Sequence, residues 1–343
     1  MAQRTMKCLG ICITLSVIAL STATILDYHP LSEERIAQIN EKAKTWKAGK
    51  NFEIEDWETV KRMANGVRPD ALLRRRHYSA PHDISEEIPD TFDAREQWPN
   101  CISIPTVWDQ SDCGSCWAIA TAAAMSDRVC IQSNQTKQTF VSAEDLNSCC
   151  VVCSDGGDGC GGGYPEEAWA YWQTHGIVTG GLYQGNQGCK DYTLAPCEHH
   201  VNYTTRPQCA DLNYVTPNCS RTCSEESGLN YTESKTYGQT PIFLAEELQI
   251  QLEILKNGPV QTSFFVMDDF PNYQSGVYEA TSINWIGNHA MKILGWGVEN
   301  GTKYWLIANT WNTDWGLDGY IKYIRGTDHL YIESSVVAAL PKA

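Results

Sequence analysis

Cys116 stands at the start of an alanine-rich run that predicts a helix. The nine residues after it read WAIATAAAM, and alanine has the highest intrinsic helix propensity. In the first turn of a helix the backbone N–H groups have no partner within the helix, and the helix dipole is positive. This position favours the thiolate over the thiol, and the thiolate is the nucleophilic form of cysteine. Cys116 is therefore a candidate nucleophile.

A cysteine nucleophile needs a base and a third group that orients the base. His289 stands at the start of a predicted apolar strand, and Asn309 stands at the end of the next one. Pairing of these strands would let the Asn309 amide oxygen accept a hydrogen bond from the imidazole, and Trp311 would shield that bond from water. Gln110 precedes Cys116 by six residues. Its amide could donate to an oxyanion together with the Cys116 backbone N–H.

The elements that must position these side chains change in type along the chain. Helical periodicity and caps dominate the first part of the body, and β-type runs dominate the last part. Helices early and strands late predict an α+β fold with two lobes. The expected helices are residues 115–132, 166–175 and 244–256, and the expected strands are 260–267, 290–298, 304–308, 320–324 and 331–338.

Residues 24–86 differ in composition from the body that follows, residues 87–343. They contain no cysteine, and they hold two predicted helices, one capped by Ser32 and one over residues 56–63. A polar stretch with three consecutive arginines at 74–76 then reads as an exposed, cleavable linker. A removable pro-segment is the prediction, and a small N-terminal subdomain is the alternative.

The N-terminus and the cysteine content indicate the secretory pathway. Arg4 and Lys7 precede an apolar run over residues 9–20, followed by small residues, which predicts a signal peptide over residues 1–23. The apolar run is too short to span a bilayer comfortably, and no other stretch qualifies. The chain has 15 cysteines, which predict a disulfide framework in an oxidising compartment. Thirteen remain once the signal peptide is removed, so one thiol is left over, and Cys116 is the candidate.

Charge and ligand spacing exclude two classes of function. Residues 87–343 carry 13 basic and 30 acidic residues, a net charge of −17, which argues against nucleic-acid binding. Cys150 and Cys153 have the spacing of one zinc-ligand pair, but the other cysteines are irregular, so no metal site is predicted. Five Asn-x-Ser/Thr triplets are predicted glycosylation sites on the surface: Asn134, Asn202, Asn218, Asn230 and Asn300.

Extended motifs around the candidate residues resemble the papain family of cysteine proteases, most closely its cathepsin B-like members. The motifs are QSDCGSCW at residues 110–117, NHA at 288–290 and NTW at 309–311. The resemblance covers nearly the whole chain. It also includes HPLS at 29–32, WKAG at 46–49, FDAREQWP at 92–99, VSAEDL at 141–146 and LGWGVENGT at 294–302.

The resemblance implies a zymogen of a papain-like peptidase, with a helical left lobe and an antiparallel β-barrel-like right lobe around a cleft. It implies Cys116 as nucleophile, His289 as acid and base, Asn309 as orienting residue and Gln110 in the oxyanion hole. No cofactor is implied, and the partners would be peptide or protein substrates, the chain's own pro-segment and cystatin-like inhibitors. A monomer in the lysosome or the extracellular space is expected. The implied disulfides are Cys101–Cys130, Cys113–Cys160, Cys149–Cys219, Cys150–Cys153, Cys189–Cys223 and Cys197–Cys209.

The distance between the two main catalytic candidates is unusually long. His289 follows Cys116 by 173 residues, whereas papain-like enzymes have about 130–150. The surplus is a disulfide-rich stretch around residues 189–209, which resembles the occluding loop of cathepsin B-like enzymes. There His199 and His200 would hold the C-terminal carboxylate of a substrate, since cationic histidine suits that role. The chain would then remove C-terminal dipeptides as well as cleave internal bonds.

The tethers of this loop also have counterparts in the sequence. Asp109 stands where the family has the partner of His199, and Asp314 stands where it has the partner of Arg206. Adjacent histidines could instead bind a metal, but neighbours in sequence rarely converge on one ion.

Two positions depart from the family pattern. Ser111-Asp112 stand where the family usually has Gly-Ser, and a carboxylate near the thiolate would raise the thiol pKa if it were close and unscreened. Ser335 stands where many cathepsin B-like enzymes have Glu at the base of the pocket for the residue two before the cut. The lost charge predicts apolar or aromatic side chains there rather than Arg. The implied substrate-binding residues are Gly162, Gly163, Tyr164, Pro165, Ala290, Trp311 and Ser335, besides the two loop histidines.

Two other functions stay open on the sequence. Cys113 and Cys116 have Cys-x-x-Cys spacing, which also occurs in thiol-disulfide oxidoreductases, although no βαβ pattern surrounds them. An inactive, protease-like binding protein is the other alternative, and the presence of all four catalytic candidates argues against it.

Overall fold

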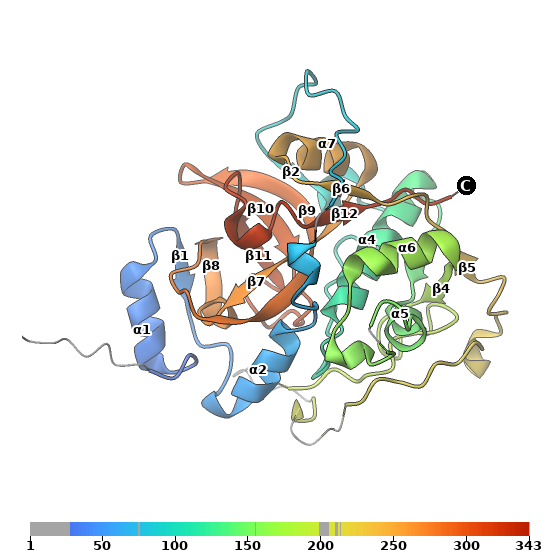
Figure 1. The fold of residues 1–343 in the computed structure, drawn as a ribbon, viewed down its shortest axis with the longest axis horizontal. Helices are drawn as coiled ribbons and strands as arrows, with labels where there is room; N and C mark the ends of the chain where they lie inside the picture. Colours follow the sequence, from blue (N-terminus) through green and yellow to red (C-terminus); the bar gives the residue numbers. More distant parts are fainter. Residues whose placement is uncertain are drawn as a thin grey trace, which may run out of the picture.

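The chain is described by a computed structural model over residues 28–74, 76–154, 156–198, 206–209, 212 and 214–342. Two lobes lie side by side, one built on helices and one on a large sheet (Figure 1). The helical lobe comes from the first part of the body and the sheet from the last part. The prediction of an α+β, two-lobe fold is confirmed.

Helix α4 (Cys116–Gln132) is the axis of the helical lobe. Its residues 116–131 are all buried, and most of their side chains are small or apolar, as expected for a helix that protein surrounds on every side. Helix α5 (Ala143–Cys149) begins at Ser142, whose hydroxyl accepts from the backbone N–H of residue 145 at 2.9 Å. Helix α6 (Pro165–Thr174) has proline at its first position, where the missing N–H costs nothing. Strands β3 (Phe140–Val141), β4 (Ile177–Gly180) and β5 (Lys235–Thr236) form a small sheet beside these helices.

The other lobe is a nine-stranded sheet with the order β1-β8-β11-β10-β9-β7-β12-β6, and β2 pairs with β9. Tryptophan and tyrosine side chains fill its core, as expected for residues that bury a large apolar area. The strands are β1 (Trp46–Ala48), β2 (Phe92–Asp93), β6 (Ile242–Leu244), β7 (Val260–Met267), β8 (Tyr273–Tyr278), β9 (Trp285–Glu299), β10 (Thr302–Ala308), β11 (Tyr320–Ile324) and β12 (Val336–Ala338).

The structure corrects three details of the predicted sheet lobe. The described strands do not close into a barrel, and β11 pairs with β8 in parallel, so the sheet is mixed. The predicted strand 331–338 is only β12, because a 3-10 turn, η7 (His329–Tyr331), precedes it with Leu330 in the left-handed conformation. Helix α7 (Glu247–Asn257) starts later than predicted, because β6 before it pairs with β12.

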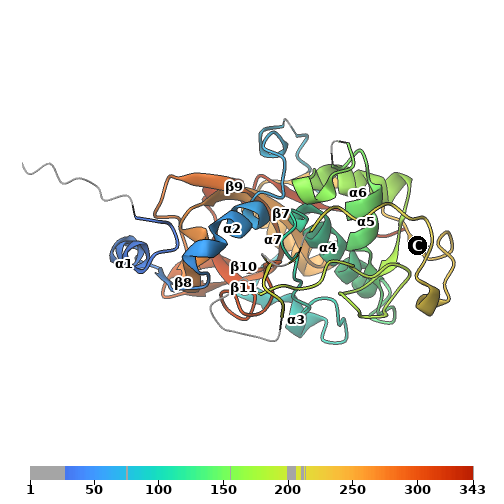
Figure 2. The same cartoon turned by 90° about the horizontal axis from the view of Figure 1, so that it is seen from below.

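The N-terminal segment is described over residues 28–74 and 76–86, and its first part, residues 28–64, packs against the sheet lobe. Strand β1 pairs antiparallel with β8 and so adds one strand to the sheet of the body. The Trp46 indole N–H donates to the Glu279 carbonyl at 2.9 Å. Helix α1 (Glu33–Lys42) packs on β1, and α2 (Trp57–Ala64) lies over β9 (Figure 2). Two 3-10 turns, η1 (Ile54–Asp56) and η2 (Ala71–Leu73), flank α2.

Two buried ion pairs join the helical lobe to the elements of the sheet lobe. Arg128 on α4 contacts Glu253 on α7 at 2.7 Å, and both side chains are buried. Asp127, the preceding residue of α4, contacts Lys292 on β9 at 2.8 Å. A buried pair needs further hydrogen bonds to offset its desolvation, and Arg128 donates two more, to the carbonyls of Gly258 and Pro259. Helix α3 (Ala94–Gln97) packs near β9 at the start of the body.

The structure forms the six disulfides that the resemblance implied. Cys116 is the free cysteine of the described residues. Cys113 is bonded to Cys160 and therefore does not pair with Cys116. The other five pairs are Cys101–Cys130, Cys149–Cys219, Cys150–Cys153, Cys189–Cys223 and Cys197–Cys209.

Candidate active site

Helix α4 and strand β9 meet at Cys116. Its thiol is the first side chain of α4 and is fully buried. The Ala290 backbone N–H, on β9, donates to Sγ at 3.3 Å. The candidate nucleophile of one lobe is thus held against the strand of the other lobe that carries His289.

His289 and Asn309 meet as the strand pairing predicts. Imidazole Nε2 lies 2.7 Å from the Asn309 Oδ1. The same oxygen accepts from the Thr310 backbone N–H at 2.8 Å, which fixes the orientation of the amide. Since an amide oxygen only accepts, Nε2 carries a proton, and in the neutral imidazole Nδ1 then carries none. The Trp311 ring lies 5.1 Å from the imidazole and covers it.

Gln110 is held with its amide N–H group directed at the site. The Thr310 hydroxyl donates to Gln110 Oε1 at 2.6 Å, so Nε2 faces the other way. Nε2 donates to the Cys113 carbonyl at 2.7 Å and to the Met63 carbonyl at 3.2 Å. Met63 belongs to the N-terminal segment, so this amide already receives a carbonyl oxygen from a separate stretch of chain. This is the geometry needed to stabilise an oxyanion.

The N-terminal segment crosses directly over the thiol at Gly66. A Cβ built on Gly66 would lie 2.5 Å from the Cys116 Sγ and 2.7 Å from the Gly114 carbonyl oxygen. The next residues bond to both walls of the site, with Val67 N–H donating to the Asn288 carbonyl and Arg68 N–H to the Gly163 carbonyl, each at 3.0 Å. The segment therefore blocks access to the nucleophile.

Burial under this segment keeps both reacting groups neutral. Burial raises the pKa of Cys116 to about 12, although backbone N–H groups of Ala290, Trp117 and Gly66 act in the opposite direction. Burial also lowers the pKa of His289 to about 4, against the opposing effect of Asn309 and the Met63 backbone. The favourable position at the helix N-terminus is thus outweighed by the loss of water.

Family comparisons agree with this geometry. Residues 88–340 match the papain family cysteine protease, and residues 31–71 match the peptidase family C1 propeptide. The chain belongs to the papain family of cysteine proteases. The N-terminal segment is its pro-segment, so the described state is a zymogen.

Individual relatives place the chain among the cathepsin B-like members. A cathepsin B-like cysteine proteinase of Caenorhabditis elegans is 44% identical over 340 residues, which covers 95% of this chain and 98% of that protein. One of Schistosoma japonicum is 42% identical, with 96% and 99% covered. The solved procathepsin B of Trypanosoma congolense is 32% identical with a TM-score of 0.77, covering 92% of this chain and 99% of its own. The protein is a cysteine peptidase of the cathepsin B type with a propeptide.

The pro-segment also packs beside residues that the family resemblance implied as walls of the pocket for the substrate residue two before the cut. Val67 and Ala71 pack in one core cluster with Cys116 and Ala290, and Tyr164 packs against it. Three other implied substrate-binding residues lie nearby in the sequence. Pro165 is the first residue of α6, and Gly162 has a φ of +96°, which favours glycine. A Cβ on Gly163 would lie 2.5 Å from the Trp117 ring, so there is no room for a side chain there. Ser335 is buried, and the Arg76 guanidinium of the pro-segment bonds to the neighbouring Ser334 carbonyl at 3.4 Å.

The predicted occluding loop is anchored at its base. His199 and His200 lie outside the described residues, as does Asn202. Arg206 forms an ion pair with Asp314 at 2.8 Å, as the tether in the family implies. The Ser111 hydroxyl donates to the Ala195 carbonyl at 2.6 Å, which holds the other end of the loop beside Gln110. The four sequon asparagines that the structure describes, Asn134, Asn218, Asn230 and Asn300, are all exposed.

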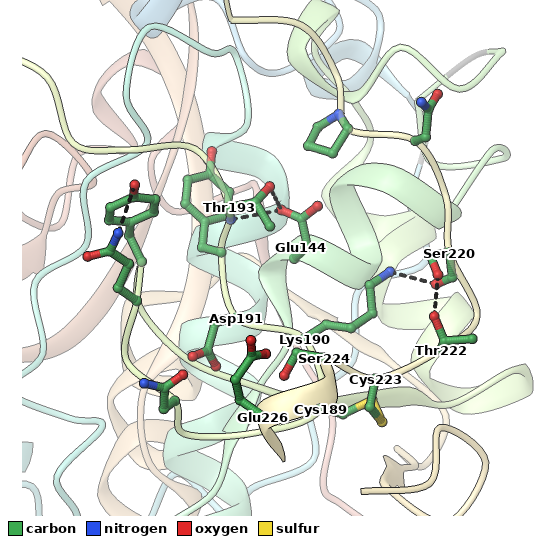
Figure 3. Close-up of a pocket in the computed structure, with 16 residues that line it drawn as sticks. Glu144, Cys189, Lys190, Asp191, Thr193, Ser220, Thr222, Cys223, Ser224 and Glu226 are labelled. Atoms are coloured by element: carbon green, nitrogen blue, oxygen red, sulfur yellow. Dashed lines mark hydrogen bonds between the residues drawn. A yellow bond between two sulfur atoms is a disulfide. The ribbon is translucent and has the colours of Figure 1, made fainter. Parts of the chain in front are cut away.

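A separate pocket of about 500 Å³ lies on the helical lobe (Figure 3). None of the four catalytic candidates lines it. Its main charged groups already have partners, because Lys190 contacts Asp145 and the Ser220 carbonyl, and Glu144 accepts from Thr193.

Within the described residues no group of three or more His, Cys, Asp or Glu could hold a metal. In the same part of the chain, no helix is long and apolar enough to cross a membrane.

The residues that hold the catalytic side chains in place were missed by the sequence reasoning. Thr310 orients the Gln110 amide, and the Tyr192 hydroxyl contacts both the Ser115 hydroxyl at 2.7 Å and the Gln110 carbonyl at 3.0 Å. Nothing local distinguishes these side chains from ordinary polar residues. The Asn65-Gly66 dipeptide was the available signal for the blocking segment, since Asn-Gly marks a turn.

Proposed function

We propose that Cys116, His289, Asn309 and Gln110 carry out peptide-bond hydrolysis through a covalent thioester. The contact of His289 with Asn309 beside the buried thiol supports these roles. After removal of the pro-segment, the Cys116 thiolate attacks the scissile carbonyl, and Gln110 Nε2 with the Cys116 backbone N–H stabilises the oxyanion. The imidazolium donates its proton to the leaving amine. Water, deprotonated by His289, then hydrolyses the thioester and restores the thiol.

We propose further that the enzyme removes C-terminal dipeptides in addition to cleaving internal bonds. The Arg206–Asp314 ion pair carries this proposal, because it ties the loop that contains His199 and His200 to the sheet lobe beside Trp311. A loop held there would leave room for only a short piece of substrate beyond the scissile bond. Protonated imidazole would pair with the terminal carboxylate, which a mid-chain substrate lacks.

The test is a matched pair of peptides, one with a free C-terminus and one amidated. His200→Ala is expected to lower kcat/KM for dipeptide removal about tenfold or more, as the loss of a charge-assisted contact predicts. Cleavage of the amidated peptide should be retained. His175→Ala, at an exposed histidine beyond the end of α6, is the control. An unchanged dipeptidase rate in His200→Ala would refute the role of the loop.

The remaining expectations concern the life of the zymogen and its specificity. We propose cleavage of a signal peptide near residue 23, folding in the secretory pathway, and removal of the pro-segment near residue 86. The family resemblance also implies a monomer that is delivered to the lysosome or exported. It further implies glycosylation at the exposed sequons and inhibition by cystatin-like proteins. Ser335 at the pocket base favours apolar or aromatic residues two before the cut, and a cleavage profile dominated by Arg there would contradict this.

A thiol-disulfide oxidoreductase is less well supported than a peptidase. It would need Cys113 and Cys116 to form one redox pair, but Cys113 is bonded to Cys160. An epoxide-type thiol inhibitor should label the activated protein and fail to label Cys116→Ala. Reduction of insulin without any peptide hydrolysis would favour the oxidoreductase instead.

A further inference from the structure

Asp112 binds an arginine side chain at the edge of the catalytic cleft. Arg62, on α2 of the pro-segment, donates from Nε to Oδ1 at 2.7 Å and from Nη2 to Oδ2 at 2.5 Å. Both carboxylate oxygens are used, which is the two-pronged geometry that gives guanidinium recognition its specificity. The Asp112 side chain is only 9% exposed in this state. The carboxylate is thus part of a site that already holds a cation.

This contact lies on one definite side of the nucleophile. The pro-segment passes Asp112 at Arg62, reaches the thiol at Gly66, and continues to Tyr164, where the Arg74 guanidinium lies 4.0 Å from the ring centre. The family resemblance implies that Tyr164 is a wall of the part of the cleft that holds residues before the scissile bond. Arg62 and Asp112 therefore lie on the opposite side, where the leaving part of a substrate would be.

Removal of the pro-segment takes away the partner of this carboxylate. In the described residues, the hydrogen bonds to the Asp112 side chain come from Arg62 alone. No cation of the body lies within ion-pairing distance in that part of the chain. Among the described residues of the body, this carboxylate would therefore be left without a cationic partner, at a position where the papain family usually has serine.

We propose that Asp112 of the activated enzyme binds an arginine or lysine side chain within the first two substrate residues after the scissile bond. The substrate's cation takes the place that the Arg62 guanidinium holds in the zymogen. This specificity role rests on the proposed peptidase function. Hydrogen bonds to a charged group contribute enough for a preference of about tenfold over a neutral side chain of the same shape.

The test compares amidated peptides that differ at one of these two positions by arginine or citrulline, which has the same shape without the charge. The activated enzyme is first titrated with an epoxide-type thiol inhibitor, so that rates refer to competent sites. In the native enzyme the kcat/KM ratio of arginine to citrulline should be about ten. In Asp112→Ser the ratio should fall to about one, and in Asp112→Lys a glutamate peptide should become the preferred substrate.

A matched control separates the local effect from net charge. Glu225→Gln removes one exposed carboxylate of η5 (Glu225–Ser227), far from the cleft in sequence, and should keep the native ratio. A native ratio near one, a ratio that persists in Asp112→Ser, or a preference only before the scissile bond would each overturn the proposal. If no peptide is cleaved and the inhibitor does not label Cys116, the proposed function itself has failed, and this inference falls with it.

Discussion

Cys116 holds its proton even though it starts a helix, because the pro-segment removes water from around it. The pKa of Cys116 is raised to about 12 by burial. At neutral pH the thiol is therefore almost entirely protonated. The lowered pKa of His289, about 4 for the same reason, keeps the imidazole uncharged as well. The zymogen therefore stores its dyad as a neutral thiol and a neutral imidazole.

Alkylation of the thiol should report this state directly. Iodoacetamide should react far more slowly with the zymogen than with the activated enzyme, because the thiolate is the reacting form. A group with a raised pKa stays protonated up to that pKa, so the zymogen rate should remain low from about pH 5 to pH 9. Mass spectrometry of the adduct measures it, and Cys116→Ala should take up no label. Equal rates in the two forms would contradict the prediction.

At the scale of single residues, the sequence predicted that Cys116, His289 and Asn309 meet at one site, but not which residues hold them in place. Cys116, His289 and Asn309 carry local signals, namely a helix start and two strand ends. The contacts of Thr310 and Tyr192 with Gln110 depend on segments far apart in the chain. The sequence predicted that the Asp112 carboxylate would raise the pKa of the thiol if it were close and unscreened. In the zymogen this carboxylate instead forms an ion pair with Arg62.

At the scale of secondary-structure elements, α2 and the turn after it cover the Cys116 thiol and so keep the zymogen inactive. Helix α2 ends at Ala64, and Gly66 then brings the backbone against the thiol. Any side chain at Gly66 would overlap the Cys116 sulfur and the Gly114 backbone. The closeness of this contact depends on the absence of a Cβ.

Gly66→Ala should therefore produce a leaky zymogen. The overlap costs about 1–3 kcal/mol, which corresponds to about 5- to 150-fold weaker docking of the turn. Hydrolysis of a fluorogenic peptide by the unprocessed chain should rise accordingly. Gly49→Ala is the matched control, since a Cβ there would meet only the flexible end of the Gln274 side chain. Equal leakage in both variants would point to general disruption of the pro-segment.

Elements were predicted best where local pattern and packing agree. Strands β7 and β11 have the predicted bounds, and α4 begins one residue inside its prediction. The stretch 331–338 is rich in strand-forming residues, yet Leu330 and Tyr331 take positive φ values and delay the strand. The pairing of β6 with β12, and of β1 with β8, joins distant segments, and no periodicity within either segment reveals it.

Across the whole molecule, the Arg128–Glu253 pair connects the lobes at a buried position. Burial would raise the pKa of Glu253, but the charge of Arg128 and hydrogen bonds from His82, Arg128 and Asn257 lower it to about 2. A carboxylate with a lowered pKa stabilises the fold above its ordinary pKa of 4.5. That stability is lost as the pH falls from about 4.5 towards 2.

Glu253→Gln should destabilise the zymogen by about 3–5 kcal/mol at neutral pH, because it leaves Arg128 buried without a counter-charge. Urea unfolding at neutral pH and near pH 3.5 measures the effect, and the difference from the native chain should shrink at the lower pH. The control is Glu86→Gln, which breaks an exposed pair with Lys256 and should cost about 0–1 kcal/mol. Similar losses in both variants would show that the buried pair has no special role.

The path of the pro-segment over the thiol also affects whether a zymogen molecule can cut its own chain during activation. Gly66 packs against the Cys116 sulfur, and the Met63 carbonyl accepts a hydrogen bond from the Gln110 amide. The pro-segment is therefore held across the candidate nucleophile of its own chain. Residues 83–87, where the pro-segment gives way to the body, are exposed to solvent on the outside of the same molecule. The first cut is then expected to come from a separate molecule, and copies that are already active should make the later cuts. Conversion should start with a lag, accelerate as product accumulates, and lose its lag when a trace of mature enzyme is added.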